Sequence, residues 1–253
     1  MTSVDLNADI GESFGRYQLA GEDELLGLVT SANVACGFHA GDPLVMQHTV
    51  SAASGRGVTI GAHPGYRDLQ GFGRRDLAAT PGEIAADVTY QVSALEGFCR
   101  AAGTRVRYVK LHGALYHRAA RDRDVARAVA FALRQLDSEL VILGPDGTAL
   151  LQAAAATGLD VAREAFVDRA YQPDGQLVPR GTPGAVLDDV ELVAERALRM
   201  VQDRYVVAID GTRCIIRADS LCVHGDGPKA VAIVRAVRQC FEAESITIAP
   251  FVK

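Results

Sequence analysis

The stretch ANVACGFHAGDP, residues 32–43, ends an apolar run of small residues in a histidine, a glycine and an aspartate. A strand that serves only a hydrophobic core would run out into a turn of Asn, Gly or Pro. The same kind of ending recurs, because His63, His112 and His224 also close short apolar runs. Repeated histidines at strand ends indicate that several strands deliver side chains to one functional face.

Short apolar runs alternate with helical patterns along the chain. The predicted strands cover residues 4–8, 32–38, 58–62, 106–111, 140–143, 161–167 and 221–223. The predicted helices cover residues 43–54, 81–102, 122–136, 146–156, 188–201 and 228–241, with a hairpin over 206–209 and 214–216. Because the composition shows no break, this β/α alternation predicts a single domain, residues 1–253, built on a parallel sheet.

The two faces of the predicted strands differ in polarity. Side chains two residues apart in a strand point the same way, so Asp5, Asn7 and Asp9 lie opposite Leu6 and Ala8. The same parity places the following residues on one face of their strands: Asn33, His39, Gly61, His63, Tyr108, Lys110, His112, Glu164 and His224. An open sheet covered on both sides would be apolar on both faces, whereas a barrel turns one face inward. We therefore predict a parallel β/α barrel of seven or eight strands.

Barrel enzymes carry their chemistry at the C-terminal ends of the strands. Four histidines reach that position on the inward parity, together with Asp9 and Glu164, and they predict a functional cluster. Lys110 is the most informative member, because an unpaired ammonium inside a barrel costs several kcal/mol. We expect it to meet a carboxylate or an anionic ligand.

Two long loops after the strands, residues 63–75 and 167–185, are rich in polar residues. Loops of this kind in a compact domain are typically lids or binding loops. Their arginines are Arg67, Arg74, Arg75, Arg169 and Arg180. Arg169 and Arg180 could each hold a carboxylate or a phosphate, or each could pair with an acid at the surface.

Composition excludes several classes of function. The net charge of −5 and the pI near 5.7 give no basic footprint for nucleic acid or for an anionic membrane. No apolar run approaches the ~18 residues that span a bilayer. The five cysteines are odd in number and form no C-x-x-C pair, which favours reduced thiols in a cytoplasmic protein.

Known motifs of catalysis and nucleotide binding are absent or incomplete. The pentapeptide GESFG, residues 11–15, matches G-x-S-x-G, but no helix begins at Ser13, as a nucleophile elbow would require. The sequence contains neither a P-loop nor a dinucleotide fingerprint. Asp9, His39 and His63 could still bind a divalent metal, because ligands need only meet in space.

Seven ordered blocks carry a family resemblance: DLNADIGESFG, ANVACGFHAGDP, GAHPGYRDLQGFGRR, VKLHGALYH, REAFVDRAY, LVPR and CVHGD. Together they resemble the LamB/YcsF family, whose members include the A subunits of ATP-hydrolysing 5-oxoprolinases. The resemblance implies a distorted seven-stranded β/α barrel similar to that of sugar deacetylases and glycosidases. It also implies ATP-dependent cleavage of 5-oxo-L-proline (pyroglutamate) to L-glutamate, in a complex with subunits B and C.

The implied reaction needs cations for the phosphate and the substrate carboxylate, a base for water and an acid for the leaving nitrogen. The candidate catalytic residues are Asp9, Glu12, His39, His63, Lys110, His112 and Glu164. The candidate substrate-binding residues are Asn7, Asn33, Asp42, Arg74, Arg169, Arg180, His224 and Asp226. The expected cofactor is ATP, with a divalent metal such as Mg²⁺ for the nucleotide, and a homo-oligomer is compatible with the sequence.

Two other functions stay open at this point. The chain could be a metal-dependent amidase or carbohydrate deacetylase that works without partners. It could also be a non-catalytic subunit whose pocket only holds the lactam.

Overall fold

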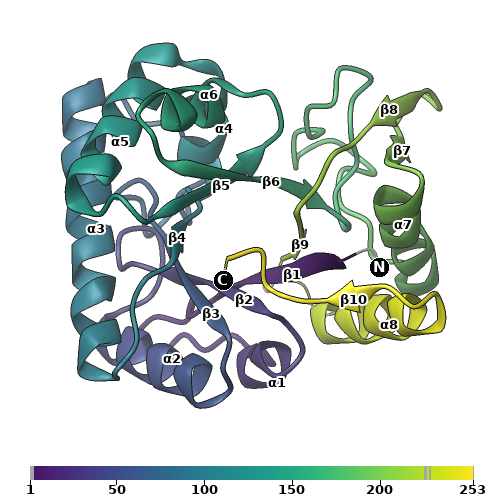
Figure 1. The fold of residues 1–253 in the computed structure, drawn as a ribbon, viewed down its shortest axis with the longest axis horizontal. Helices are drawn as coiled ribbons and strands as arrows, with labels where there is room; N and C mark the ends of the chain where they lie inside the picture. Colours follow the sequence, from purple (N-terminus) through teal and green to yellow (C-terminus); the bar gives the residue numbers. More distant parts are fainter. Residues whose placement is uncertain (1–2, 225–226, 228, 253) are drawn as a thin grey trace.

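The fold is a closed ring of seven parallel strands surrounded by helices (Figure 1). The computed structural model describes residues 3–224, 227 and 229–252. In ring order the strands are β1 (Ser3–Ile10), β2 (Ser31–Ala35), β3 (Thr59–His63), β4 (Tyr108–Val109), β5 (Val141–Pro145), β6 (Asp160–Phe166) and β9 (Ser220–Val223). Strand β9 pairs with both β6 and β1, which closes the ring. The predicted distorted seven-stranded barrel is therefore confirmed.

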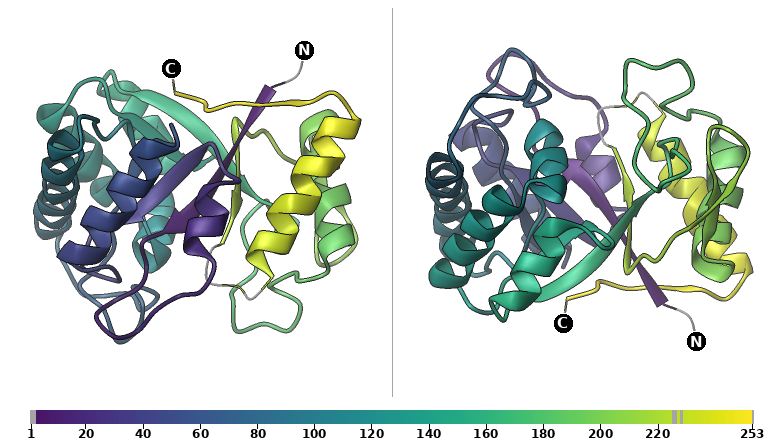
Figure 2. Two further views of the ribbon diagram at one scale, coloured as in Figure 1. Left: turned by 90° about the horizontal axis from the view of Figure 1, so that it is seen from below. Right: turned by 90° about the horizontal axis from the view of Figure 1, so that it is seen from above.

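Helices cover the outside of the ring and bury the apolar face of the strands (Figure 2). They are α1 (Glu22–Leu26), α2 (Pro43–Gly55), α3 (Pro81–Ala101), α4 (Gly113–Arg121), α5 (Arg123–Leu136), α6 (Ala149–Ala156), α7 (Val190–Gln202) and α8 (Ala230–Ala243). Two of the predicted start signals act as expected. Thr80 and Glu83 form a capping box at α3, and Asp42 caps α2.

Several elements differ from the sequence prediction. Strand β2 ends at Ala35 and not at residue 38, because Gly37 takes a φ of 93° and its N–H bonds to the Ala40 carbonyl. Strand β4 has only two residues. The short helices α1 and α4 and the short strand β10 (Thr247–Ile248), which pairs with the start of β1, were not predicted. The predicted hairpin is present as β7 (Tyr205–Val207) and β8 (Arg213–Ile215).

Polar side chains fill the N-terminal half of the barrel interior. The Asp5 carboxylate accepts hydrogen bonds from Thr30 and Ser31, both at 2.6 Å, and from Ser220. Burial raises the pKa of Asp5 to about 6, although these three hydroxyls act to lower it. One layer higher, the Asn33 amide donates to Asn7 Oδ1 at 2.7 Å. The small and polar inward face of the strands thus forms a hydrogen-bonded core.

The N-terminal end of the barrel is closed by an apolar cluster. The ring of Tyr108 packs against Phe251 of the C-terminal tail, with ring centroids 5.0 Å apart. In Figure 1 this tail, in yellow, returns over the middle of the ring. The other, C-terminal end of the barrel is left for the site. Within the described part of the chain, no helix is both long and apolar enough to cross a bilayer.

Candidate active site

A cavity of about 880 Å³ lies at the C-terminal ends of the strands. Its wall includes six of the inward-facing residues expected from the sequence: Asp9, His63, Lys110, His112, Glu164 and His224. Three loop arginines, Arg74, Arg169 and Arg180, also line it. The parity of the strands therefore located the polar wall of the cavity correctly.

Lys110 lies between two buried carboxylates. Its Nζ is 3.0 Å from Asp9 Oδ1 and 2.9 Å from Glu164 Oε1, and the Lys110 side chain is 3% exposed. The residue follows β4 and stays in line with β3, because its N–H bonds to the Ala62 carbonyl. The prediction that Lys110 meets a carboxylate at the barrel mouth is confirmed.

The charges of this group support one another. Burial alone would raise the pKa of Asp9, but His63 and Lys110 beside it hold that pKa well below its usual range. Burial alone would lower the pKa of Lys110, yet Asp9, Cys222 and Glu164 raise it well above the usual value. An ammonium and a carboxylate are therefore kept charged inside the barrel at neutral pH.

Three histidines and a glutamate form a second buried group beside the first. The rings of His39 and His112 stack with centroids 3.7 Å apart, and His63 Nε2 lies 3.0 Å from His112 Nδ1. Glu12 Oε1 lies 3.5 Å from His39 Nε2 and 3.7 Å from His112 Nδ1. Burial lowers the pKa of both His39 and His112 well below the usual value.

This second group differs from the set of possible metal ligands named from the sequence, which was Asp9, His39 and His63. One donor atom from each of Glu12, His39, His63 and His112 lies within 4.8 Å of the others. Asp9 is not a member of this group; its Oδ1 lies 3.0 Å from Lys110 Nζ and 3.4 Å from His63 Nε2. His39 reaches the group from a loop four residues beyond β2, so the strand parity assumed for it was wrong, although its position at this end of the barrel was predicted.

His224 lies on another part of the cavity wall, paired with an aspartate that the sequence pattern did not single out. The ring Nδ1 of His224 is 2.9 Å from Asp168 Oδ2, and the backbone N–H of His224 donates a hydrogen bond to the same carboxylate. The His224 ring also stacks on the ring of Phe166. Asp168 has the same parity as Glu164 and lies just beyond the predicted end of its strand. Extending the parity rule by one residue would have found it.

Tyr116 is also a site residue that was missed. Its hydroxyl donates to Glu164 Oε2 at 2.8 Å and fixes the carboxylate that pairs with Lys110. It lies on α4, a helix with a glycine in its first turn and no periodic apolar pattern long enough to be recognised. No signal in the sequence marked it.

Three of the expected substrate-binding residues have structural partners. Asn33 donates to Asp9 Oδ1 at 2.8 Å, and Asn7 donates to Ser220, so both belong to the core beneath the cavity. Asp42 accepts from the N–H groups of Leu44 and Val45 at the start of α2 and does not line the cavity. We therefore assign Asn7 and Asn33 to positioning and Asp42 to the helix cap. Asp226 lies outside the described residues.

The loop arginines divide into two kinds. Arg169 is buried and donates to the carbonyls of Val178 and Ala185, so it holds its own loop together. Burial and the neighbouring Arg180 lower the pKa of Arg169 to about 10. Arg180 is half-buried in the cavity wall, and Arg74 lies over the ring of Phe72 at 4.9 Å. Arg74 and Arg180 thus contribute cationic side chains to the cavity wall.

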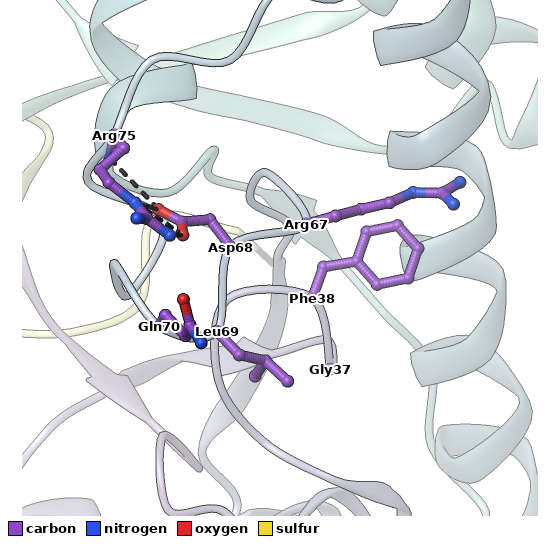
Figure 3. Close-up of a pocket in the computed structure, with 7 residues that line it drawn as sticks. All are labelled: Gly37, Phe38, Arg67, Asp68, Leu69, Gln70 and Arg75. Carbon is purple, nitrogen blue, oxygen red and sulfur yellow. Dashed lines mark hydrogen bonds and ion pairs between the residues drawn. The ribbon is translucent and has the colours of Figure 1, made fainter.

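The other two arginines belong to a separate, shallow pocket of about 370 Å³ (Figure 3). Arg75 pairs there with Asp68, and Arg67 lies over the ring of Phe38 while pairing with Asp87 on α3. These contacts shape the loop and leave both guanidinium groups outside the main cavity. Arg67 and Arg75 are therefore both paired with carboxylates outside the main cavity.

Ser13 has no arrangement for nucleophilic catalysis. Its Oγ donates to Glu22 at 3.0 Å and accepts from the Leu19 N–H at 2.9 Å. The side chain thus stabilises the loop before α1, as expected from the lack of a helix at the serine.

Comparisons with known proteins give a consistent picture. The model of the LamB/YcsF family matches residues 4–253. The chain is 54% identical over 248 residues to the A subunit of 5-oxoprolinase from Limosilactobacillus fermentum, covering 98% of this chain and 99% of that one. It is 49% identical over 247 residues to the A subunit of 5-oxoprolinase from Pyrococcus horikoshii, covering 98% and 97%. The structure matches that of a lactam utilization protein from Thermus thermophilus with a TM-score of 0.92 and 46% identity, covering 98% and 99%.

Proposed function

Since the chain belongs to the LamB/YcsF family, we propose that it is the A subunit of an ATP-dependent 5-oxoprolinase. The reaction cleaves 5-oxo-L-proline to L-glutamate and converts ATP to ADP and phosphate. ATP with its Mg²⁺ is the proposed cosubstrate of the complex, and subunits B and C are the proposed partners. All five cysteines are free thiols, which agrees with the expected cytoplasmic location.

The observation that carries this proposal is the buried ammonium of Lys110 between Asp9 and Glu164 at the wall of a large cavity. An unstrained five-membered lactam is a stable amide, so its hydrolysis benefits from activation of the carbonyl group. A fixed positive charge in a buried site stabilises negative charge that develops on the carbonyl oxygen or on a phosphate bound to it. The two carboxylates keep that charge in place before the substrate arrives.

The proposed sequence of steps begins with phosphorylation of the lactam oxygen by ATP. Water then adds to the activated carbon, and the ring nitrogen takes up a proton as the C–N bond breaks. A second water hydrolyses the resulting acyl phosphate, which releases glutamate and phosphate. The base and the acid are drawn from the candidate set of Asp9, Glu12, His39, His63, His112 and Glu164.

The substrate carboxylate and the phosphate need cations beyond Lys110. Arg74 and Arg180 line the cavity, and a guanidinium can bind either anion with two parallel hydrogen bonds. The cavity is much larger than one small lactam. The extra space accommodates a phosphate group, or a loop of another protein of the complex that excludes water from the activated intermediate.

The test measures release of glutamate and phosphate from 5-oxoproline and ATP by this chain alone and after addition of subunits B and C. We expect coupled release only with the three subunits together and only with ATP. Glutamate formation by the isolated chain at the rate of the full complex would contradict the dependence on partners.

One alternative retains specific support, because the group formed by Glu12, His39, His63 and His112 has the residue types of a metal site. A metal-dependent amidase would release glutamate without ATP and would lose activity with a chelator. A chain that only binds the lactam would bind 5-oxoproline tightly, and the complex would keep full activity when Lys110 is replaced. The same assay, run with these variations, separates the three functions.

A further inference from the structure

Two of the three histidines beside the cavity have their protons fixed by backbone carbonyls. The Nδ1–H of His63 donates to the Lys110 carbonyl at 2.8 Å, and the Nε2–H of His112 donates to the Phe72 carbonyl at 2.8 Å. A carbonyl oxygen can only accept, so each of these nitrogens carries the proton. The opposite nitrogens, His63 Nε2 and His112 Nδ1, are then the ones with free lone pairs.

Those two lone pairs point at each other. His63 Nε2 lies 3.0 Å from His112 Nδ1, and when both rings are neutral neither nitrogen carries a hydrogen that could bridge them. Asp9 Oδ1, another acceptor, lies 3.4 Å from the same His63 nitrogen. The Glu12 carboxylate, which also only accepts when it is ionised, adds an oxygen 3.7 Å from the same His112 nitrogen. Acceptor atoms packed against one another in a buried space repel unless a cation lies among them.

His39 completes the group and supplies an independent observation. Its side chain is fully buried, and neither ring nitrogen has a hydrogen-bond partner within the described part of the chain. Its Nε2 lies 3.5 Å from Glu12 Oε1, the same oxygen that lies 3.7 Å from His112 Nδ1. A buried imidazole without a hydrogen-bond partner costs free energy unless another ligand satisfies it.

From this geometry we infer that Glu12, His39, His63 and His112 form a binding site for a divalent transition-metal ion, with Zn²⁺ as the best match. Three imidazoles and a carboxylate are ligands that suit zinc in tetrahedral coordination. Metal–ligand bonds of about 2.0 to 2.1 Å in a tetrahedron place the donor atoms about 3.3 Å apart. The four donor atoms already lie within 4.8 Å of one another, so small side-chain movements close the site.

The surroundings have the features of a supported metal site. Metal-binding histidines typically donate their second ring N–H to a carbonyl or carboxylate, which fixes the ring, and the carbonyls of Lys110 and Phe72 serve that purpose here. His63 and His112 line the main cavity, which gives an ion a route of entry. A metal ion at this position can polarise a carbonyl or activate water. The inference concerns binding of the ion and stands whether or not the chain acts on a lactam.

The test uses the full chain, stripped of metal and titrated with Zn²⁺ against a chromophoric chelator. We expect one ion per chain, with X-ray absorption at the zinc edge showing nitrogen and oxygen ligands including imidazoles. Loss of a partner that only orients a ligand costs about 10- to 100-fold in affinity, so His39→Asn and His112→Gln should each weaken binding at least about 100-fold. His48→Gln, at an exposed histidine outside the group, is the matched control and should bind like the wild type.

Three results would overturn the inference. The first is no retention of Zn²⁺ at micromolar concentration by the wild-type chain. The second is unchanged affinity in both folded variants, which would place the ion elsewhere. The third is sulfur ligation in the X-ray absorption spectrum of the wild-type chain, which would show that a cysteine binds the ion. After the first result, an N–H signal shared between His63 and His112 would identify the cation of the site as a proton in place of a metal ion.

Discussion

The Nζ of Lys110 lies 2.9 Å from Oε1 of Glu164, and the pair crosses the barrel interior from the end of β4 to β6. Asp9 of β1 holds the other side of the same ammonium at 3.0 Å. Side chains from β1 and β6 therefore meet at the ammonium group of Lys110, which follows β4. Removal of any one member leaves the others as buried charges with fewer partners.

Lys110→Met should abolish turnover and also lower stability. The variant keeps most of the side-chain volume but leaves Asp9 and Glu164 without their shared cation. We expect at least about a 100-fold loss of glutamate formation in the three-subunit complex. We also expect a loss of about 3 to 5 kcal/mol in the free energy of unfolding, as for other broken buried ion pairs.

The measurements are coupled turnover and urea unfolding of the isolated chain. Lys229→Met is the matched control, because Lys229 is exposed and pairs with Asp188 at the surface. It should change neither quantity by a measurable amount. Near-normal turnover by folded Lys110→Met would show that the lysine is structural.

Asp5 should make stability depend on pH in a direction unusual for an aspartate. Its pKa in the folded chain is about 6, above the usual value of 3.8, so the folded state binds the proton more tightly than the unfolded state. Stability from this group is therefore full below about pH 4 and falls as the pH rises to about 6. A shift of about two units corresponds to about 3 kcal/mol.

The comparison with Asp5→Asn isolates this effect from all other titrating groups. The stability difference between wild type and variant, measured by urea unfolding, should move by about 3 kcal/mol in favour of the variant from about pH 4 to about pH 7. A difference that stays constant with pH would show that Asp5 titrates normally.

Gly61 should be intolerant of any side chain, because the ring of Tyr108 packs across it. A Cβ at Gly61 would lie 2.2 Å from that ring, whose hydroxyl is tied to Asn33. We expect Gly61→Ala to cost about 1 to 3 kcal/mol of stability, the usual range for overpacking. In a Tyr108→Ala background the same change should cost much less, and a double-mutant cycle measures the difference.

Gly97, inside α3, provides the opposite control. A Cβ there meets nothing within 4 Å, so Gly97→Ala should stabilise the chain by up to about 1 kcal/mol, as alanine does in a helix. Equal costs for Gly61→Ala with and without the Tyr108 ring would refute the packing argument.

Strand parity predicted the part of the site that lies on or in line with regular strands. Asp9, His63, Lys110 and Glu164 follow the alternation of the strand backbone, so their direction could be deduced from the sequence alone. The barrel was predicted for the same reason. The positions of the other site residues depend on tertiary contacts that the sequence pattern does not contain.

His39 illustrates that limit, because a glycine turn at Gly37 ends the strand and the loop beyond it delivers the ring. Asp42 illustrates another, since an aspartate before a proline can cap a helix or bind a ligand, and only the contacts show which. Tyr116 could not be found at all, because its helix is too short for a periodic signal.

Arg180 should matter for substrate or phosphate, whereas Arg67, from the other arginine-rich loop, should not. Arg180 lies half-buried in the wall of the main cavity, while Arg67 is exposed and committed to Asp87. We expect Arg180→Gln to raise the KM for 5-oxoproline or lower kcat by at least about 10-fold, a loss of about 1.4 kcal/mol in transition-state binding. Arg67→Gln should leave both constants near those of the wild type, since an exposed ion pair contributes at most about 1 kcal/mol to stability and nothing to the cavity.

Steady-state kinetics of the complex, with co-purification of subunits B and C as a check on assembly, provide the measurement. Normal kinetics for Arg180→Gln, or equal losses in the two variants, would contradict the assignment of Arg180 to the anion.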